Sequence, residues 1–149
     1  MSPDIDARFL DTDYDETSIH PEILPAVRSI RNSGVETIAS HSGIRLYGPD
    51  NFLGSYIQVR IFTRDGFEVA RKIAEFADAL TVRMQQDLQN PTLTLQLISA
   101  EAWFKDRNTT SMETLVPIYR LQLVGHSTDE EICHVWSAVA QNFTPGVIE

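Results

Sequence analysis

Apolar and polar side chains alternate along several stretches of the chain, which predicts amphipathic strands. Residues 55–63, "SYIQVRIFT", place an apolar side chain at every second position, and residues 115–124, "LVPIYRLQLV", largely do the same. A period of two puts the apolar side chains on one face of a strand. Residues 35–40, which end in a polar, Gly-containing corner, and residues 92–104, "TLTLQLISAEAWF", predict two more strands.

Three other segments carry apolar residues at the spacing of an amphipathic helix. The first lies within 21–33 and ends in an Asn-Ser-Gly stop signal. The second follows Asp65, which forms a capping-box pattern with Glu68, and the third follows Ser127, which forms the same pattern with Glu130. We therefore expect each of these two helices to begin directly after its capping residue.

The predicted order is helix, strand, strand, helix, strand, strand, helix. Half-polar alternating strands with short connections favour an antiparallel sheet that has one solvated face. Helices would cover the other face, so the sequence predicts an α+β two-layer sandwich of ferredoxin-like type with a four- to five-stranded antiparallel sheet. The 149 residues suit one domain, and we expect an acidic N-terminal arm over 1–18 and a single α+β domain over 19–149.

Charge and composition argue against several classes of protein. The net charge of −9 repels phosphate backbones, so we expect no nucleic-acid partner. No apolar run reaches the roughly 18–20 residues that span a bilayer, and the acidic N-terminus has no apolar signal region, so we expect neither a membrane anchor nor secretion. The single cysteine, Cys133, is consistent with a reducing, cytoplasmic location.

The corner after residues 35–40 is the most promising place for a site. About 11 helical residues span roughly 16 Å and six strand residues roughly 20 Å, so the start of the first helix and the end of the strand should meet. This estimate places Ser18 and His20 close to His41, Ser42 and Gly43.

Two interpretations of this corner are open. Backbone amides around Ser42 and Gly43, with Arg45 and the imidazoles of His20 and His41, could hold a small anionic ligand. The alternative is a tight turn that needs Gly43 only for its backbone angle.

The segment "SIRNSGVETIASHSG" resembles a loosely defined set of uncharacterised bacterial and phage proteins that share a helix ending in Gly and the pattern G-x-x-T-x-x-S-C-x-G. The resemblance covers roughly residues 20–62, and the matching residues are Gly34, Thr37, Ser40 and Gly43. His41 stands where those proteins have Cys, a departure that argues against thiol chemistry at this position. The resemblance implies a similar corner in a similar fold and does not imply a reaction.

The acidic arm carries part of a calcium-binding pattern. Asp11, Asp13, Asp15 and Glu22 occupy places 1, 3, 5 and 12 of a calcium loop, but Glu16 stands where Gly makes the sharp turn. The alternatives are a looser divalent site that includes His20 or His41, and a solvated arm. We expect the solvated arm, and we expect no cofactor.

The two amphipathic strands also predict a polar sheet face. If they are neighbours, their polar side chains gather on one surface, with two tyrosines nearby: Arg60, Arg120, Gln58, Gln122, Tyr56 and Tyr119. Such a face can form a homodimer interface or the floor of a ligand site, and the alternative is a plain solvated surface.

These observations favour a small cytoplasmic, non-enzymatic binding or interaction domain, homodimeric through a sheet face or edge. Its partner would be a small anionic ligand at residues 41–45 or a host protein. An enzyme is the alternative, in which His41 acts as the general base of a hydrolase- or transferase-like reaction with His20 or an arm carboxylate. A divalent-metal site in residues 11–22 is a further alternative.

Overall fold

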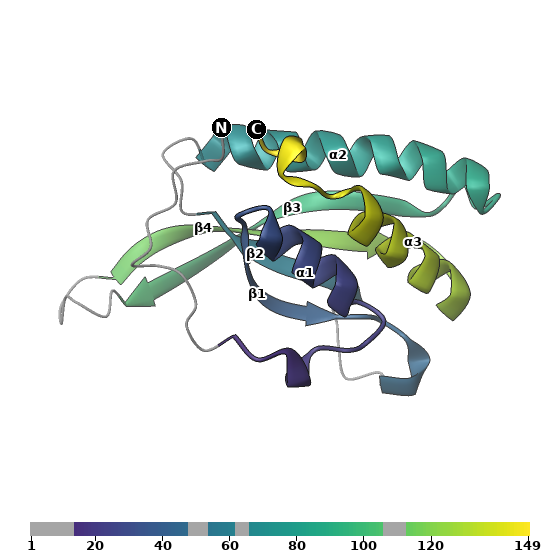
Figure 1. Ribbon diagram of the computed structural model, residues 1–149, viewed down its shortest axis with the longest axis horizontal. Coiled ribbons are helices and arrows are strands. Elements are labelled where there is room, and N and C mark those ends of the chain that lie inside the picture. Colours follow the sequence, from purple (N-terminus) through teal and green to yellow (C-terminus); the bar gives the residue numbers. More distant parts are fainter. Residues whose placement is uncertain (1–13, 48–53, 62–65, 106–112) are drawn as a thin grey trace.

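The computed structural model describes residues 14–47, 54–61, 66–105 and 113–149, with the backbone alone for 100–105 and 113–117 (Figure 1). None of the described helices is both long and apolar enough to cross a membrane. The elements in chain order are the short 3-10 helix η2 (Glu16–Ser18), α1 (Leu24–Asn32), β1 (Glu36–His41), the short η3 (Arg45–Tyr47), β2 (Ser55–Arg60), α2 (Gly66–Asp87), β3 (Thr94–Lys105), β4 (Glu113–Val124), α3 (Asp129–Asn142) and η4 (Pro145–Val147).

The four strands form one antiparallel sheet in the order β1-β2-β4-β3, and α1, α2 and α3 lie on the same face of it (Figure 1). The predicted α+β fold, a four-stranded antiparallel sheet covered by helices on one side, is therefore confirmed. The strands β2 and β3 are joined through α2 with β4 between them, which is a split β-α-β unit. The chain order differs from the βαββαβ order of ferredoxin-like domains, so that finer assignment is not confirmed.

The core lies between the sheet and the three helices. Alternate residues of β2 and β4, such as Ile57, Val59, Leu121 and Leu123, are buried and point toward the helices. The side chain of Trp136 in α3 is completely buried, and its indole N–H donates a hydrogen bond of 2.6 Å to the Ser55 hydroxyl. Since an indole N–H needs a partner when it is buried, this hydrogen bond lets α3 bring its largest side chain into the core.

The last helix begins one residue later than the sequence pattern predicted. The capping box consists of Thr128 and Glu131, whose side chains bond each other's backbone N–H groups, and the prediction of Ser127 and Glu130 was wrong. Both pairs match the S/T-x-x-E spacing, so the spacing by itself could not choose between them. The predicted cap at Asp65 lies outside the described residues.

The predicted polar sheet face is present on β2 and β4. Gln58 pairs with Arg120 and Tyr56 with Gln122 across the ladder. Tyr119 pairs with buried Val59 and therefore lies on the helix-covered face, as its alternation with Arg120 and Gln122 along the strand predicts, and not beside the polar face.

Several side chains of the polar face contact one another. Arg60 forms an ion pair with the almost completely buried carboxylate of Glu36, its partner in the β1–β2 ladder. The guanidinium of Arg120 lies 5.9 Å from the ring centroid of Tyr56, within reach of a cation–π contact. The face is thus stabilised by contacts between its own side chains.

We expect Ser55→Ala to lower the free energy of unfolding by about 1–3 kcal/mol, because the buried indole N–H of Trp136 would lose its acceptor. Urea denaturation followed by tryptophan fluorescence measures this change. The matched control is Ser137→Ala on the exposed side of α3, which should change stability by less than about 0.5 kcal/mol. Equal effects of the two variants would show that the Trp136–Ser55 hydrogen bond contributes nothing.

Candidate functional site

The predicted meeting of the first helix and the first strand is confirmed at His20 and Ser42. The Nδ1 atom of His20 lies 2.9 Å from the Ser42 hydroxyl and accepts the backbone N–H of Ser42 at 3.2 Å. Ser42 has no exposed surface, so His20 closes over it. The corner therefore joins the segment before α1 to the end of β1, as the chain-length estimate required.

Successive backbone amides of the corner are bonded to acceptors within the protein. The N–H of Gly43 donates to Nδ1 of His41 at 2.9 Å, and the N–H of Ile44 donates to the Ser42 hydroxyl at 3.3 Å. The N–H of Arg45 lies 3.4 Å from a carboxylate oxygen of Asp129 in α3. Amides that are already bonded, beside a carboxylate, offer little to an anion, so the geometry does not favour the anion cradle.

Gly43 fits the interpretation of the corner as a tight turn. Its φ angle is +75°, in the left-handed region that other residues adopt with strain. A Cβ atom at this position would lie 2.8 Å from Cβ of Ser55. The corner thus needs glycine both for its backbone angle and for its close approach to the start of β2.

The two imidazoles act as acceptors in this structure. Because Nδ1 of His20 and Nδ1 of His41 each accept an amide N–H, the proton of each neutral ring is on Nε2. A general base needs an accessible lone pair and commonly a group that orients it. The described contacts of His41 include no carboxylate, and the buried Ser42 hydroxyl is out of reach of a substrate, so this geometry lends the enzymatic alternative no support.

Tyr47 contacts both His20 and Glu22. The two rings stack with centroids 3.6 Å apart, and the Tyr47 hydroxyl donates to the Glu22 carboxylate at 2.7 Å. This hydrogen bond raises the pKa of Tyr47. Burial and then the neighbouring His41 lower the pKa of His20, while Glu22 acts in the opposite direction. The neutral form of His20 is therefore the one that the corner favours.

The carboxylates of the calcium pattern have separate partners where they are described. Asp15 accepts the backbone N–H and the hydroxyl of Thr17, at 2.9 Å and 2.7 Å, and Glu22 accepts the Tyr47 hydroxyl. Asp11 and Asp13 lie outside the described residues. Within the described part of the chain, no three His, Cys, Asp or Glu side chains gather closely enough to hold a metal ion.

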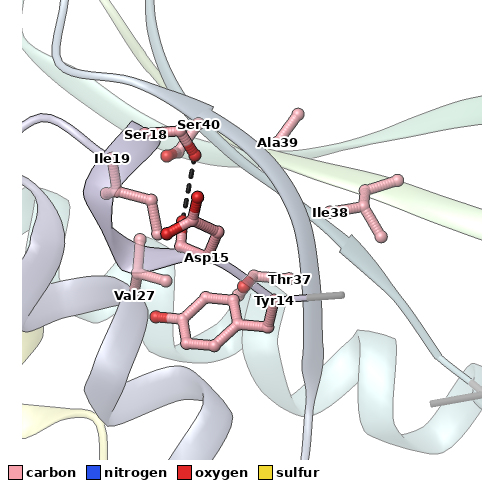
Figure 2. Close-up of a pocket in the computed structure, with 9 residues that line it drawn as sticks. All are labelled: Tyr14, Asp15, Ser18, Ile19, Val27, Thr37, Ile38, Ala39 and Ser40. Atoms are coloured by element: carbon pink, nitrogen blue, oxygen red, sulfur yellow. Dashed lines mark hydrogen bonds between the residues drawn. The ribbon is translucent and has the colours of Figure 1, made fainter. Parts of the chain in front are cut away.

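A groove of about 280 Å³ lies between the segment around η2 and the strand β1 (Figure 2). We call it the edge groove, and its lining consists of Tyr14, Asp15, Ser18, Ile19, Val27, Thr37, Ile38, Ala39 and Ser40. Figure 2 shows the side chains of Ile38 and Ala39 directed away from Tyr14 and Asp15, on the other side of the ribbon.

The position of this groove relative to the strand is unusual for a pocket on a sheet face. The β1 register shifts between Thr37 and Ala39, and the side chains of Ile38 and Ala39 both point away from Tyr14 and Asp15, so these two residues border the groove with their backbone (Figure 2). The edge groove is lined by four consecutive residues, 37–40. It therefore lies against the outer backbone edge of β1, which is an outermost strand of the sheet as described.

The lining is mixed in character. Asp15 is the charged residue among those that line the groove, and its hydrogen bonds to Thr17 lower its pKa, which keeps the carboxylate ionised. Ser18 and Ser40 add hydroxyl groups, and the Ser18 hydroxyl donates to the Asp15 carbonyl (Figure 2). Ile19 and Val27 form the apolar part on the helix side. This combination suits a ligand with an apolar body and a positively charged group.

Sequence reasoning did not identify this groove. It assigned Tyr14 and Asp15 to a solvated arm, whereas the Tyr14 ring packs partly against the core and lies under the guanidinium of Arg31, 3.7 Å from it. The feature of the sequence that could have indicated the groove is Tyr14, an aromatic residue within an otherwise acidic and polar stretch. The structure gives residues 14–18 a place on the body of the domain, and residues 1–13 of the predicted arm lie outside the described residues.

Comparisons of the chain with protein-family models, with curated proteins and with solved structures found no match. The resemblance of residues 20–62 to bacterial and phage proteins thus stays a prediction.

We expect Gly43→Ala to lower the free energy of unfolding by about 2–4 kcal/mol, because it combines left-handed strain with a clash against Ser55. Gly54→Ala separates the two effects, since Gly54 has a φ angle of +74° but open space around it. That control should cost about 1–2 kcal/mol. Chemical denaturation of both variants measures the difference, and equal losses would show that the Ser55 contact is unimportant.

We expect the stability of the protein to fall as the pH drops below about 6.5, the ordinary pKa of histidine, partly through His20. The folded state lowers the pKa of His20, so the unfolded chain binds the proton more readily. The stabilising contribution of neutral His20 is therefore complete above pH 6.5. It is lost as the pH falls through the pKa of the folded state.

His20→Asn tests this assignment, because the amide oxygen of Asn can accept the Ser42 N–H without titrating. Free energies of unfolding measured from pH 7.5 to 5 should fall less steeply in the variant than in the wild type. Parallel curves would show that His20 does not cause the pH dependence.

Proposed function

We propose that the protein is a non-enzymatic binding domain whose ligand occupies the edge groove. The observation that carries this proposal is a groove of about 280 Å³ along four consecutive residues of an outermost strand. This volume is close to the lower end of the range for small-molecule sites, about 300–1,000 Å³. A ligand there would meet backbone groups of β1 on one side and the Asp15 carboxylate on the other.

The edge groove is a better candidate than residues 41–45. At the corner, the amides of Ser42, Gly43 and Ile44 already donate to side chains of the protein. In the groove, Asp15 uses one carboxylate oxygen for both of its bonds to Thr17, which leaves the other oxygen for a ligand. The expected anionic ligand gives way in this proposal to one that carries positive charge.

A screen of small fragments by ¹⁵N–¹H NMR tests the proposal. We expect fragments that carry an amine and an apolar ring to shift the amide signals of residues 37–40. A dissociation constant of about 1 mM follows from roughly 0.3 kcal/mol per atom for about 14 heavy atoms.

Ser40→Tyr should fill the groove and remove these shifts, whereas Ser137→Tyr on the exposed side of α3 should leave them unchanged. Shifts that cluster on residues 41–45 would instead favour the corner, and the absence of any fragment binding would contradict a binding role for the groove.

A further inference from the structure

We propose that the natural occupant of the edge groove is an extended, basic peptide segment that adds to β1 as a further strand and places a Lys or Arg side chain at Asp15. This inference rests on the proposed binding function and specifies its ligand class. It follows from the position of the groove on the strand and from its charge, and the irregularity of β1 limits the length of the added strand.

The position of the groove favours a strand over a compact molecule. β1 is bonded to β2 on one side, and among the described residues no strand lies on its other side. Alternate residues of such an edge direct their backbone N–H and C=O groups outward, where an added strand can bond to them. Because the groove runs along the strand over residues 37–40, a peptide in it would lie parallel or antiparallel to β1.

The charge of the groove favours a basic segment. Asp15 is the charged residue of the lining, and the nearby Glu16 is already paired with Arg28. The chain carries a net charge of −9, so a cationic peptide would be attracted over a longer range as well. A second copy of the chain would bring a second Asp15 and a further −9 to the same edge, which disfavours self-pairing through β1.

The irregularity of β1 limits the length of the added strand. The β1–β2 register shifts between Thr37 and Ala39, as expected for a β-bulge, and the Thr37 carbonyl accepts a hydrogen bond of 3.0 Å from Arg31. The regular part of the edge is therefore Ala39–His41. A peptide of about five residues covers this length, so binding should be weak and depend on the side chain at Asp15.

The probe is the peptide acetyl-Lys-Val-Lys-Val-Lys-amide, titrated into ¹⁵N-labelled full-length protein at low salt. Acetyl-Lys-Pro-Lys-Pro-Lys-amide has the same charge but lacks two N–H groups and cannot continue a ladder. Acetyl-Glu-Val-Glu-Val-Glu-amide keeps the strand propensity and reverses the charge. We expect the first peptide to shift the amides of residues 37–41 and to bind at least tenfold more tightly than either control.

Asp15→Asn should weaken the first peptide about two- to fivefold, the size of an exposed ion pair, while keeping the cap of η2, because Asn caps as well as Asp. Asp78→Asn makes the same charge change on the exposed side of α2 and should have no effect.

Equal binding of the proline and valine peptides would overturn strand addition, and equal binding by Asp15→Asn would overturn the role of Asp15. If no peptide binds but fragments still occupy the groove, the peptide inference fails and the proposed binding function stands. Self-association that Ser40→Tyr abolishes would identify a second copy as the occupant and contradict this inference.

Discussion

The hydrogen bond from the Trp136 indole to the Ser55 hydroxyl connects α3 to the start of β2, and the packing of the helices on the sheet depends on this contact. Ser55 is the first residue of β2, and a Cβ atom at Gly43 would lie 2.8 Å from Cβ of Ser55, so any side chain at position 43 forces a shift there. One small, buried side chain thus holds α3, the start of β2 and the corner after β1. A larger residue at Ser55 would disturb all three, whereas alanine would remove only the hydrogen bond.

The corner illustrates how a polar cluster can serve the fold instead of a ligand. His20, His41, Ser42 and Tyr47 have the composition of a catalytic or binding site. The first three, however, accept the amide N–H groups of the turn, and Tyr47 stacks on His20. A buried amide without a partner costs about 1–3 kcal/mol, so these acceptors stabilise the turn. The same contacts that support the turn leave His41 without a free Nδ1 lone pair for proton transfer.

The edge groove has the opposite character, because its polar groups are only partly used. The Asp15 carboxylate has one oxygen without a bond in the described contacts, and the outer edge of β1 has no neighbouring strand among the described residues. Exposed sheet edges are a hazard in most proteins, and the register shift in β1 and the Arg31 contact to Thr37 shorten this one. What is left is a short edge beside a carboxylate, which suits a selective and weak interaction.

The order of helices and strands, the α+β class and the meeting of His20 with Ser42 could be predicted from the sequence. These features depend on local periodicity, on the stop signal at Gly34 and on the lengths of two adjacent elements, which short-range physics determines. The same alternation places Tyr119 on the core face with Leu121 and Leu123. The choice between Thr128 and Ser127 as the cap of α3 was decided by the tertiary structure. The partners of the corner histidines also depend on the tertiary structure, which brings Nδ1 of His20 to the Ser42 N–H and Nδ1 of His41 to the Gly43 N–H. The edge groove arises from residues 14–19 and 37–40, whose contact depends on which strand is outermost. Strand order is set by long-range pairing energy, and no local pattern in this sequence encodes it.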